Sequence, residues 1–363
     1  MLNNKNIGID ARMIDKSGIG IYIQHLMGYG LYDYAIGNES EIRKYDTNVN
    51  VIPFDAPIYK IKEQMLFPIQ EINDAKIEIM HFPHYNVPIS YQGRYVVTIH
   101  DLTHLIFPEY LGSKLKYKYA KFLLHNAVNR ADHIFTVSEN TKQDLVRYLG
   151  VQENNISITY NAVDDDFRVK EKKEIVYLYE KFNIPNNQKL ILYVGNIKPH
   201  KNIETLLKAF KLLNKEDIFL ILTGKEFKNF NIYDKIKELG IENKVIITGS
   251  IDKEDLINLY NLADVFVFPS LYEGFGIPPL EAMACGTPVI AANNSSIPEV
   301  VGNAAILFNG NNIKELSDDI LKILFCENTR KDLIIKGFNR YKYFSWNKTL
   351  SIIETNISTL CTT

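Results

Sequence analysis

The chain alternates short apolar runs with longer segments in which apolar residues recur at helical spacing. Turn residues bound the apolar runs, which favours βα units and mostly parallel sheets. In the first half, strands are predicted at 6–10, 49–54, 77–82, 95–100, 133–137 and 156–160. In the second half, they are predicted at 190–194, 219–223, 245–248, 265–268, 288–291 and 305–308. Each half therefore has enough strands for a doubly wound sheet of its own.

A polar interruption separates the two halves. The segment 161–168 is followed by a charged stretch at 169–174, where few core contacts are expected to cross. We predict an N-terminal Rossmann-like domain over 1–170 and a C-terminal Rossmann-like domain over 171–344. A last helix over 345–363, with Ser345 as its N-cap, carries the only tryptophan. Ligands of such folds bind where strands end, so the loops that follow strands are expected to carry the chemistry.

Composition mainly excludes classes of protein. The 363 residues include 41 Lys and Arg against 43 Asp and Glu, so no chain-wide basic field favours nucleic acid as a partner. No apolar run approaches the ~20 residues that span a bilayer, and the polar start lacks the apolar core of a secretory signal. Three scattered cysteines are too few for a disulfide framework or a four-thiolate zinc site. A cytoplasmic location is expected.

The first candidate loop follows the strand at 6–10. Gly18 and Gly20 precede a helical segment and permit close approach of the backbone to a ligand. Position 23 is isoleucine, so the six-residue dinucleotide fingerprint is incomplete, and no Gly-Lys-Ser/Thr follows that would make a P-loop. A tight turn would use the same two glycines.

Histidines end two neighbouring strands. His100, followed by Asp101, ends the strand at 95–100, and an unperturbed pKa near 6.5 would allow hydrogen bonding or proton transfer near neutral pH. A structural histidine bonded to backbone would occupy the same position. His81 and His84 end the strand at 77–82 and would line the same wall, although turn building explains most of that proline-rich loop.

A third loop opens the second half of the chain. The strand at 190–194 is followed by Gly195 and then by Lys198, His200 and Lys201 before a helix. Fixed N–H donors combined with mobile cations make a good electrostatic cradle for a diphosphate.

The fourth loop is the most distinctive. After the strand at 265–268, Glu273 precedes the turn Gly274-Phe275-Gly276, and Pro278-Pro279 start a helix whose first turn is expected to contain Glu281. Glu281 taken alone would be explained as compensation of the helix dipole. Because proline has no N–H, the donors to an anionic ligand would be the amides of Phe275, Gly276, Ile277 and Leu280.

With these four loops in this order, the sequence resembles the retaining, nucleotide-sugar-dependent glycosyltransferases of family 4 over nearly the whole chain. The most specific part runs from Glu273 to Glu281 and looks like that family's Glu-x7-Glu motif. The segment 193–202 is similar to the branch that includes bacterial surface-polysaccharide mannosyl- and rhamnosyltransferases. The resemblance implies an α/β protein of GT-B fold. Two doubly wound Rossmann-like domains would face a deep cleft, and the C-terminal helix would cross back to the N-terminal domain.

The resemblance also implies residue roles. Glu273 would hydrogen-bond donor-sugar hydroxyls, Glu281 would bind the nucleotide ribose, and Lys201 would bind phosphate. The expected catalytic residues are His100, Glu273 and Lys201. The expected donor-binding residues are Gly18, Gly20, Asn196, His200, Lys201, Glu273, Gly274, Phe275, Gly276, Ile277 and Glu281. Asp101, His84 and Tyr85 are expected on the acceptor side. Asn196 departs from the arginine of many members, so Lys198 or His200 would have to supply that charge.

The implied activity is transfer of a hexose with retention, favouring a mannose-type donor, from a nucleotide sugar to a glycan or polyprenyl-diphosphate-linked glycan. No metal or other cofactor is expected. Two alternatives stay open. Asp164-Asp165-Asp166 invites interpretation as the metal-binding motif of a GT-A transferase. A nucleotide-sugar epimerase, or another non-transferase nucleotide-sugar-binding protein, would fit the same two-sheet plan.

One predicted helix has the composition of a membrane-surface helix. In the segment 113–125, one face carries Lys114, Lys118 and Lys121 and the adjacent face carries Leu115, Tyr119 and Phe122. Such a pattern suits contact with anionic lipid, which would place the protein on the inner face of the cytoplasmic membrane. An ordinary amphipathic surface helix has the same pattern.

Overall fold

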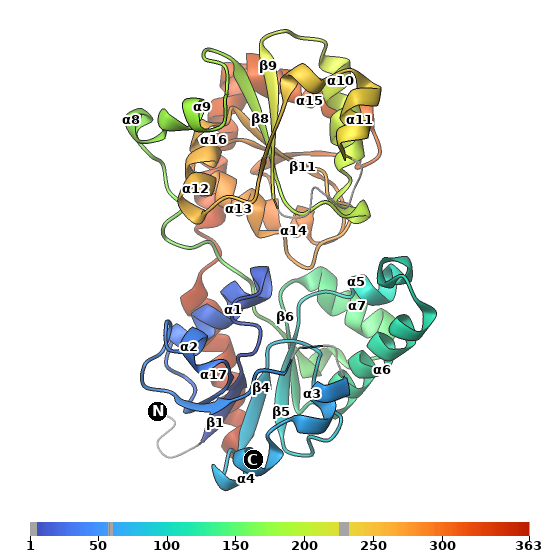
Figure 1. Ribbon diagram of the computed structural model, residues 1–363, viewed down its shortest axis with the longest axis vertical. Helices are drawn as coiled ribbons and strands as arrows, with labels where there is room; N and C mark the ends of the chain where they lie inside the picture. The colour runs from blue at the N-terminus through green and yellow to red at the C-terminus, as the bar shows by residue number, and fades with distance from the viewer. Residues whose placement is uncertain (1–5, 57, 59–60, 225–231, 363) are drawn as a thin grey trace. The chain divides into compact units, whose positions relative to one another are not determined.

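Two separate parallel sheets organise the chain (Figure 1). The computed structural model describes residues 6–56, 58, 61–224 and 232–362. Unit 1 comprises Met1–Asn161 with Trp346–Thr363, and unit 2 comprises Ala162–Ser345. From the charged stretch we predicted a domain boundary after residue 170, whereas the two units divide after Asn161. The intervening segment packs on unit 2, because the Phe167 ring lies edge-on to Tyr260 at 6.1 Å and the Lys170 N–H donates to Asn261.

The sheet of unit 1 has the strand order β3-β2-β1-β4-β5-β6-β7, and all neighbouring strands are parallel. Its strands are β1 (Ile7–Asp10), β2 (Tyr34–Gly37), β3 (Asn50–Pro53), β4 (Ile79–Phe82), β5 (Tyr95–Ile99), β6 (His133–Thr136) and β7 (Ile156–Ile158). The apolar pattern misses β2. This strand has four residues, of which only Ala35 and Ile36 form an apolar run, so its own sequence is too short for a period to emerge.

Helices cover both faces of this sheet (Figure 1). They are α1 (Ser17–Gly28), α2 (Glu39–Ile42), α3 (Ile61–Leu66), α4 (Ile69–Asp74), α5 (Thr103–Ile106), η1 (Pro108–Leu111), α6 (Lys114–Arg130), α7 (Glu139–Leu149), η2 (Glu153–Asn155) and α17 (Trp346–Thr362). Because side chains alternate along a strand, Met80 and Phe82 enter one core cluster and Ile79 enters the other. Leu350 and Ile353 of α17 belong to the same cluster as Ile79, so the last helix packs in unit 1.

The sheet of unit 2 has the order β10-β9-β8-β11-β12-β13, again all parallel. Its strands are β8 (Lys189–Val194), β9 (Ile218–Thr223), β10 (Val245–Gly249), β11 (Val265–Phe268), β12 (Val289–Ala292) and β13 (Ala305–Phe308). The pattern predicts each of these within one residue at either end. The helices are α8 (Lys172–Ile175), α9 (Tyr177–Lys181), η3 (Pro199–Lys201), α10 (Ile203–Leu213), α11 (Ile232–Leu239), η4 (Glu242–Lys244), α12 (Lys253–Leu262), α13 (Ile277–Ala284), α14 (Ile297–Val301), α15 (Ile313–Phe325) and α16 (Glu327–Tyr341).

Both sheets reverse their strand order at one point, between β1 and β4 in unit 1 and between β8 and β11 in unit 2. The connections that leave the two central strands run to opposite sides there, and ligands of open α/β sheets bind at the carboxyl ends of those strands. The loops after β8 and β11 contain Lys201 and Glu273. Two doubly wound, Rossmann-like units confirm the predicted fold class. Within the described ranges, no helix is both long and apolar enough to cross a bilayer.

Candidate active site

Lys201 and Glu273 form an ion pair at the switch point of unit 2. The Lys201 Nζ lies 2.6 Å from the Glu273 Oε1. The two side chains are 20% and 13% exposed, so the pair lies at the surface of the unit and not in its core. The ammonium also lies 6.0 Å from the centroid of the Phe268 ring. Two residues predicted from separate loops are therefore in direct contact.

The turn around Lys201 is held by its neighbours. Asn202 has a left-handed backbone with φ of +54°, and its Nδ2 donates to the carbonyls of Pro269 and Gly310 at 3.2 and 2.7 Å. The His200 carbonyl accepts from the Leu271 N–H at 2.7 Å. These bonds tie the loop after β8 to the loops after β11 and β13. Contacts among three loops thus fix the backbone on either side of Lys201.

The residues proposed to replace the missing arginine differ in exposure. His200 is only 6% exposed, and it contributes its backbone carbonyl to the loop contacts. Lys198 is exposed. Asn196 is half-buried, and its carbonyl accepts from the Tyr193 hydroxyl at 3.2 Å. Of the two candidates, Lys198 therefore presents the accessible cation.

The glycine-rich turn after Glu273 requires its glycine at position 276. Gly276 has φ of +90°, and a Cβ there would lie 3.3 Å from the Phe268 ring, so a larger residue would be strained. It is the N-cap of α13, which begins at Ile277. The Phe275 ring is buried and meets Phe344 edge-on at 5.3 Å. Gly274 completes the turn. The first amides of α13 lie at the positive end of the helix dipole, as expected for anion binding.

Glu281 differs from its expected place. The prediction put it in the first turn of the helix, but α13 starts at Ile277, before the prolines, and its first turn contains no acidic residue. The carboxylate instead accepts a hydrogen bond from the Tyr260 hydroxyl at 2.8 Å. Burial raises the pKa of Glu281 to about 7, against the lowering effect of the Tyr260 bond. Glu281 therefore does not compensate the helix dipole from the first turn.

The acidic run before β8 is paired with a lysine. The Lys253 Nζ lies 2.8 Å from a carboxylate oxygen of Asp164 and 2.8 Å from one of Asp166. An ammonium thus neutralises the two carboxylates on which the metal-binding interpretation depends. The presence of two doubly wound sheets also contradicts a GT-A fold.

His100 in unit 1 is held in one tautomer. Its Nε2 lies 2.9 Å from the Pro83 carbonyl, which can only accept, so Nε2 carries the proton and Nδ1 carries the lone pair. The ring meets Tyr22 edge-on at 5.1 Å. Burial lowers the pKa of His100, so the prediction of an unperturbed value was wrong. At neutral pH His100 is a neutral hydrogen-bond acceptor at Nδ1.

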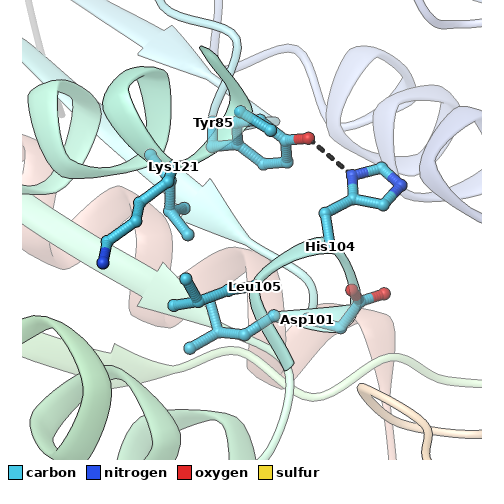
Figure 2. Close-up of a pocket in the computed structure, with 8 residues that line it drawn as sticks. Tyr85, Asp101, His104, Leu105 and Lys121 are labelled. Carbon is cyan, nitrogen blue, oxygen red and sulfur yellow. Dashed lines mark hydrogen bonds between the residues drawn. The ribbon is translucent and has the colours of Figure 1, made fainter. Parts of the chain in front are cut away.

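The other acceptor-side residues lie close to His100 in sequence or space. Tyr85 bonds through its hydroxyl to the Nδ1 of His104 at 2.8 Å, and Figure 2 shows the two side chains pointing toward one another. Asp101 accepts a hydrogen bond from the Thr103 N–H, at the start of α5, at 2.7 Å. His84 lies against Tyr85 with ring centroids 4.1 Å apart. Together with Leu102, Leu105, Ala120, Lys121 and Leu124, the residues Tyr85, Asp101 and His104 line a small pocket.

Two predictions about unit 1 need correction. Gly18 and Gly20 lie inside the first turn of α1 and not in a loop before it. A Cβ on Gly20 would lie 2.6 Å from the Ile14 carbonyl oxygen, so that glycine allows the preceding loop to pack on the helix. His81 is fully buried between the Tyr32 and Thr98 hydroxyls, and burial lowers its pKa to about 3. His81 is therefore a core residue.

A buried charged cluster next to His84 was not predicted from the sequence. Arg12 donates to Asp10 at 2.8 Å and to Glu63 at 2.6 Å, and Glu63 also accepts from Asn86. Arg12 and Glu63 have side chains that are 3% and 0% exposed. Arg12 lies two residues after the end of the first predicted strand. This position near a strand end was the signal that the sequence offered.

The predicted basic helix, α6, has a mixed outer face. Lys114, Lys118 and Lys121 are exposed. Leu115 and Phe122 are 78% and 53% exposed, which is high for large apolar side chains. Tyr119, expected beside them, instead packs against the core of unit 1.

Comparisons with known proteins match both halves of the chain. The family model described as Glycosyl transferases group 1 matches residues 178–340, and the model described as Glycosyltransferase Family 4 matches residues 37–167. The chain is 34% identical over 279 residues to O-antigen chain mannosyltransferase B of Escherichia coli, covering 76% of this chain and 72% of that protein. It is 31% identical over 241 residues to O-antigen chain mannosyltransferase RfbU of Salmonella typhimurium, covering 66% and 63% of the two chains.

Solved structures share the fold at low sequence identity. The structure of HepE from Anabaena in complex with UDP and glucose has a TM-score of 0.80 and 17% identity, covering 98% of this chain and all of that one. WaaG, a glycosyltransferase involved in lipopolysaccharide biosynthesis, has a TM-score of 0.75 and 12% identity, covering 96% and 98% of the two chains.

Proposed function

The chain belongs to glycosyltransferase family 4, among the group 1 enzymes of GT-B fold, and we propose that it transfers mannose from a nucleoside diphosphate sugar to a glycan. The acceptor is a growing surface-polysaccharide chain, free or linked to polyprenyl diphosphate. The choice of mannose rests on the O-antigen mannosyltransferases among its relatives. Transfer retains the configuration of the anomeric carbon, as the family resemblance implies.

The observation that carries this proposal is the Lys201–Glu273 pair beside the turn that ends in Gly276. Breaking a sugar–diphosphate bond builds negative charge on the leaving phosphate, and a catalyst must stabilise that charge. Lys201 supplies a mobile cation, and the amides at the start of α13 supply fixed donors. Glu273, adjacent to the ammonium, is placed to accept hydrogen bonds from sugar hydroxyls.

The bond changes require no nucleophile from the protein. The bond between the anomeric carbon and the phosphate oxygen breaks while the acceptor oxygen attacks the same face of the sugar. The acceptor hydroxyl proton passes to the leaving phosphate oxygen. His100, neutral and held by Pro83, orients a substrate hydroxyl by accepting its hydrogen bond at Nδ1. Glu281 accepts hydrogen bonds from the ribose.

We propose that the reaction needs no divalent cation. In metal-dependent transferases a cation neutralises the diphosphate. Here that task falls to Lys201, with Lys198 as a second accessible cation, while Asp164 and Asp166 are engaged by Lys253. Turnover should therefore continue in EDTA. Loss of turnover in EDTA with recovery on addition of Mn²⁺ would contradict this part of the proposal.

The activity is tested with labelled GDP-mannose, UDP-glucose and dTDP-rhamnose in the presence of a bacterial lipid extract. Transfer of label from GDP-mannose into the lipid or glycan fraction is expected, and NMR of the product should show the anomeric configuration of the donor. Transfer from another sugar nucleotide would correct the donor. Sugar-nucleotide conversion without any acceptor product would instead favour an epimerase.

We further propose that α6 holds the protein on anionic lipid. Its exposed lysines complement acidic headgroups, at ~1 kcal/mol for each basic residue near the surface, and Leu115 and Phe122 can enter the apolar boundary. The test is flotation with vesicles that contain phosphatidylglycerol. The triple variant Lys114→Glu, Lys118→Glu, Lys121→Glu should lose binding. The control variant Lys314→Glu, Lys331→Glu, Lys336→Glu makes the same charge change in unit 2 and should float. Equal flotation of both variants would refute the assignment.

A further inference from the structure

Two serines in the loop between β12 and α14 contact the turn that follows Glu273. The Ser295 Oγ donates to the Glu273 carbonyl at 2.8 Å and accepts from the Glu273 N–H at 3.3 Å. The Ser296 Oγ lies 2.9 Å from the Glu273 carbonyl oxygen and 3.0 Å from that of Phe275. Ser296 is fully buried. Neither serine belongs to the motifs from which the function was argued.

Each hydroxyl has a single proton to donate. Because Ser295 already supplies a proton to the Glu273 carbonyl, the Ser296 proton is available to the Phe275 carbonyl. The carbonyls of Glu273 and Phe275 are therefore both satisfied from the side on which the serines lie. An unsatisfied carbonyl at this buried position would cost free energy, so the serines favour one orientation of each peptide unit.

The orientation of the carbonyls decides the orientation of the next amides. In a trans peptide the C=O and N–H point in opposite directions. When the carbonyls of Glu273 and Phe275 point to the serines, the N–H groups of Gly274 and Gly276 point away from them. Two glycines make this turn adaptable, so the direction of its amides needs a restraint from outside the turn. The serines provide that restraint.

We propose that Ser295 and Ser296 are positioning residues for catalysis, which aim the amides of Gly274 and Gly276 at the leaving diphosphate. The same bonds hold the Glu273 backbone where its side chain meets Lys201. Charge stabilisation by fixed donors depends on their being oriented before the reaction starts. This inference rests on the proposed function, because it assigns to the serines a role in binding the donor of that reaction.

The test compares variants by inhibition of transfer with GDP and with guanosine, or with UDP and uridine if a thermal-shift screen selects uridine nucleotides. Ser296→Ala should weaken GDP inhibition roughly tenfold, the effect of misplacing one or two charge-assisted hydrogen bonds. Guanosine has no phosphate, so its inhibition constant should not change. The kcat should fall while the acceptor KM stays constant. Ser296→Cys, which keeps a weak donor, should recover part of the loss.

Two further variants control for misfolding and for the general effect of removing a buried hydroxyl. Ser295→Gly removes the second hydroxyl at a residue with φ of +54°, where glycine relieves strain, so its loss of GDP inhibition cannot come from a distorted backbone. This variant carries the test if Ser296→Ala fails to fold. Ser317→Ala removes a buried hydroxyl from α15 in the same unit and should behave as wild type.

The outcomes separate the two proposals. Wild-type inhibition by GDP in both Ser296→Ala and Ser295→Gly would overturn the positioning role. So would equal losses for GDP and guanosine, because that result describes general damage to the binding site. A wild-type protein that binds no nucleoside diphosphate and transfers no sugar would instead refute the proposed function, and the positioning role with it.

Discussion

The two units place charged residues at equivalent edges of similar sheets and use them differently. In unit 2, Lys201 has one carboxylate partner and remains 20% exposed. In unit 1, Arg12 has two carboxylate partners and is 3% exposed. Its guanidinium also lies within 5.6 Å of the ring centroids of Phe54 and Phe67. Asp10 and Glu63 raise the pKa of Arg12 above its ordinary value despite the opposing effect of burial.

On the proposed function, this difference separates a binding charge from a structural one. Arg12 joins the loop after β1 to α3, and a ligand could reach it only by displacing buried partners. On the proposed function, Lys201 exchanges Glu273 for a phosphate at the surface. Burial acts on protons in the same way in both units, because it favours the neutral form. It lowers the pKa of His81, His84 and His100 in unit 1 and raises that of Glu281 in unit 2 to about 7.

The largest effect is expected from removal of the exposed cation. Lys201→Ala should lower kcat/KM for sugar transfer by roughly a thousandfold, because it removes a charge that stabilises the leaving diphosphate. Its thermal stability should change little, since the lost pair is partly exposed. Lys208→Ala on α10, whose ammonium pairs with Glu204, is the matched control and should retain activity. Near-normal turnover of Lys201→Ala would contradict the proposal that Lys201 binds the donor diphosphate.

Arg12→Ala should show the opposite pattern, with loss of stability as its main effect. Removing one partner of a buried ion cluster leaves Glu63 uncompensated, which typically costs about 3–5 kcal/mol. Urea unfolding followed by the fluorescence of Trp346 reports on unit 1, where that residue stacks on His25 at 4.0 Å. Lys44→Ala, which breaks only an exposed pair with Glu41, should unfold as wild type does. A fully stable Arg12→Ala with impaired transfer would make Arg12 a binding residue.

A smaller effect is expected in the pH dependence of donor binding. A carboxylate that accepts ribose hydrogen bonds must be ionised, so donor affinity should rise with pH and level off above about 7, the raised pKa of Glu281. Glu281→Gln should bind more weakly and without this rise. His100→Asn should keep the rise, because the carboxyl of Glu281 remains in that variant. If the rise in donor affinity were lost in His100→Asn and kept in Glu281→Gln, the prediction that Glu281 causes it would be wrong.

The Glu281 carboxyl also affects folding stability. Its contribution falls as the pH rises, whereas donor affinity is expected to rise. Its pKa is higher in the folded state than the ordinary 4.5, so the folded protein retains a proton that the unfolded chain releases between pH 4.5 and 7. This contribution to stability is therefore fully present below pH 4.5 and is lost as the pH rises to about 7. Glu281→Gln should remove that slope from the urea midpoint.

The smallest expected effect comes from Asp164. Its charge raises the pKa of Glu281, whereas Lys253 lowers it. Asp164→Asn should therefore move the midpoint of the pH-dependent donor affinity to lower pH without abolishing binding. Asp318→Asn on α15, where the carboxylate pairs with Lys314, should leave the midpoint in place. An unchanged midpoint in Asp164→Asn would show that the charge of Asp164 does not raise the pKa of Glu281.

Local sequence was sufficient for most of the fold. The strands of unit 2 follow from apolar runs bounded by turn residues, and the loops with Lys201 and Glu273 follow from glycines and charges after those runs. β2 escaped detection because four residues carry too little pattern and its place is decided by pairing with β1 and β3. The start of α13 was misjudged because left-handed Gly276, and not the prolines, determines it.

The contacts of the site were harder to predict from the sequence than its motifs. Ser295 and Ser296 lie outside the Glu273–Glu281 segment, and nothing in their own neighbourhood signals a role in it. The Arg12–Glu63 pair joins residues from loops far apart in the chain. Neither the depth of Glu281 nor the neutrality of His100 can be read from periodicity, because burial depends on what the other elements place around a side chain.

The sequence by itself determined two parallel-sheet units, the four loops that matter and the family. These features depend on short-range pattern, on glycine and on the order of motifs along the chain. Only the tertiary structure decided that Lys201 meets Glu273 at the surface, that Arg12 pairs with two carboxylates, and that two serines hydrogen-bond to the turn before α13. Those outcomes depend on distances between segments and on the free energy of burying charge, neither of which is local.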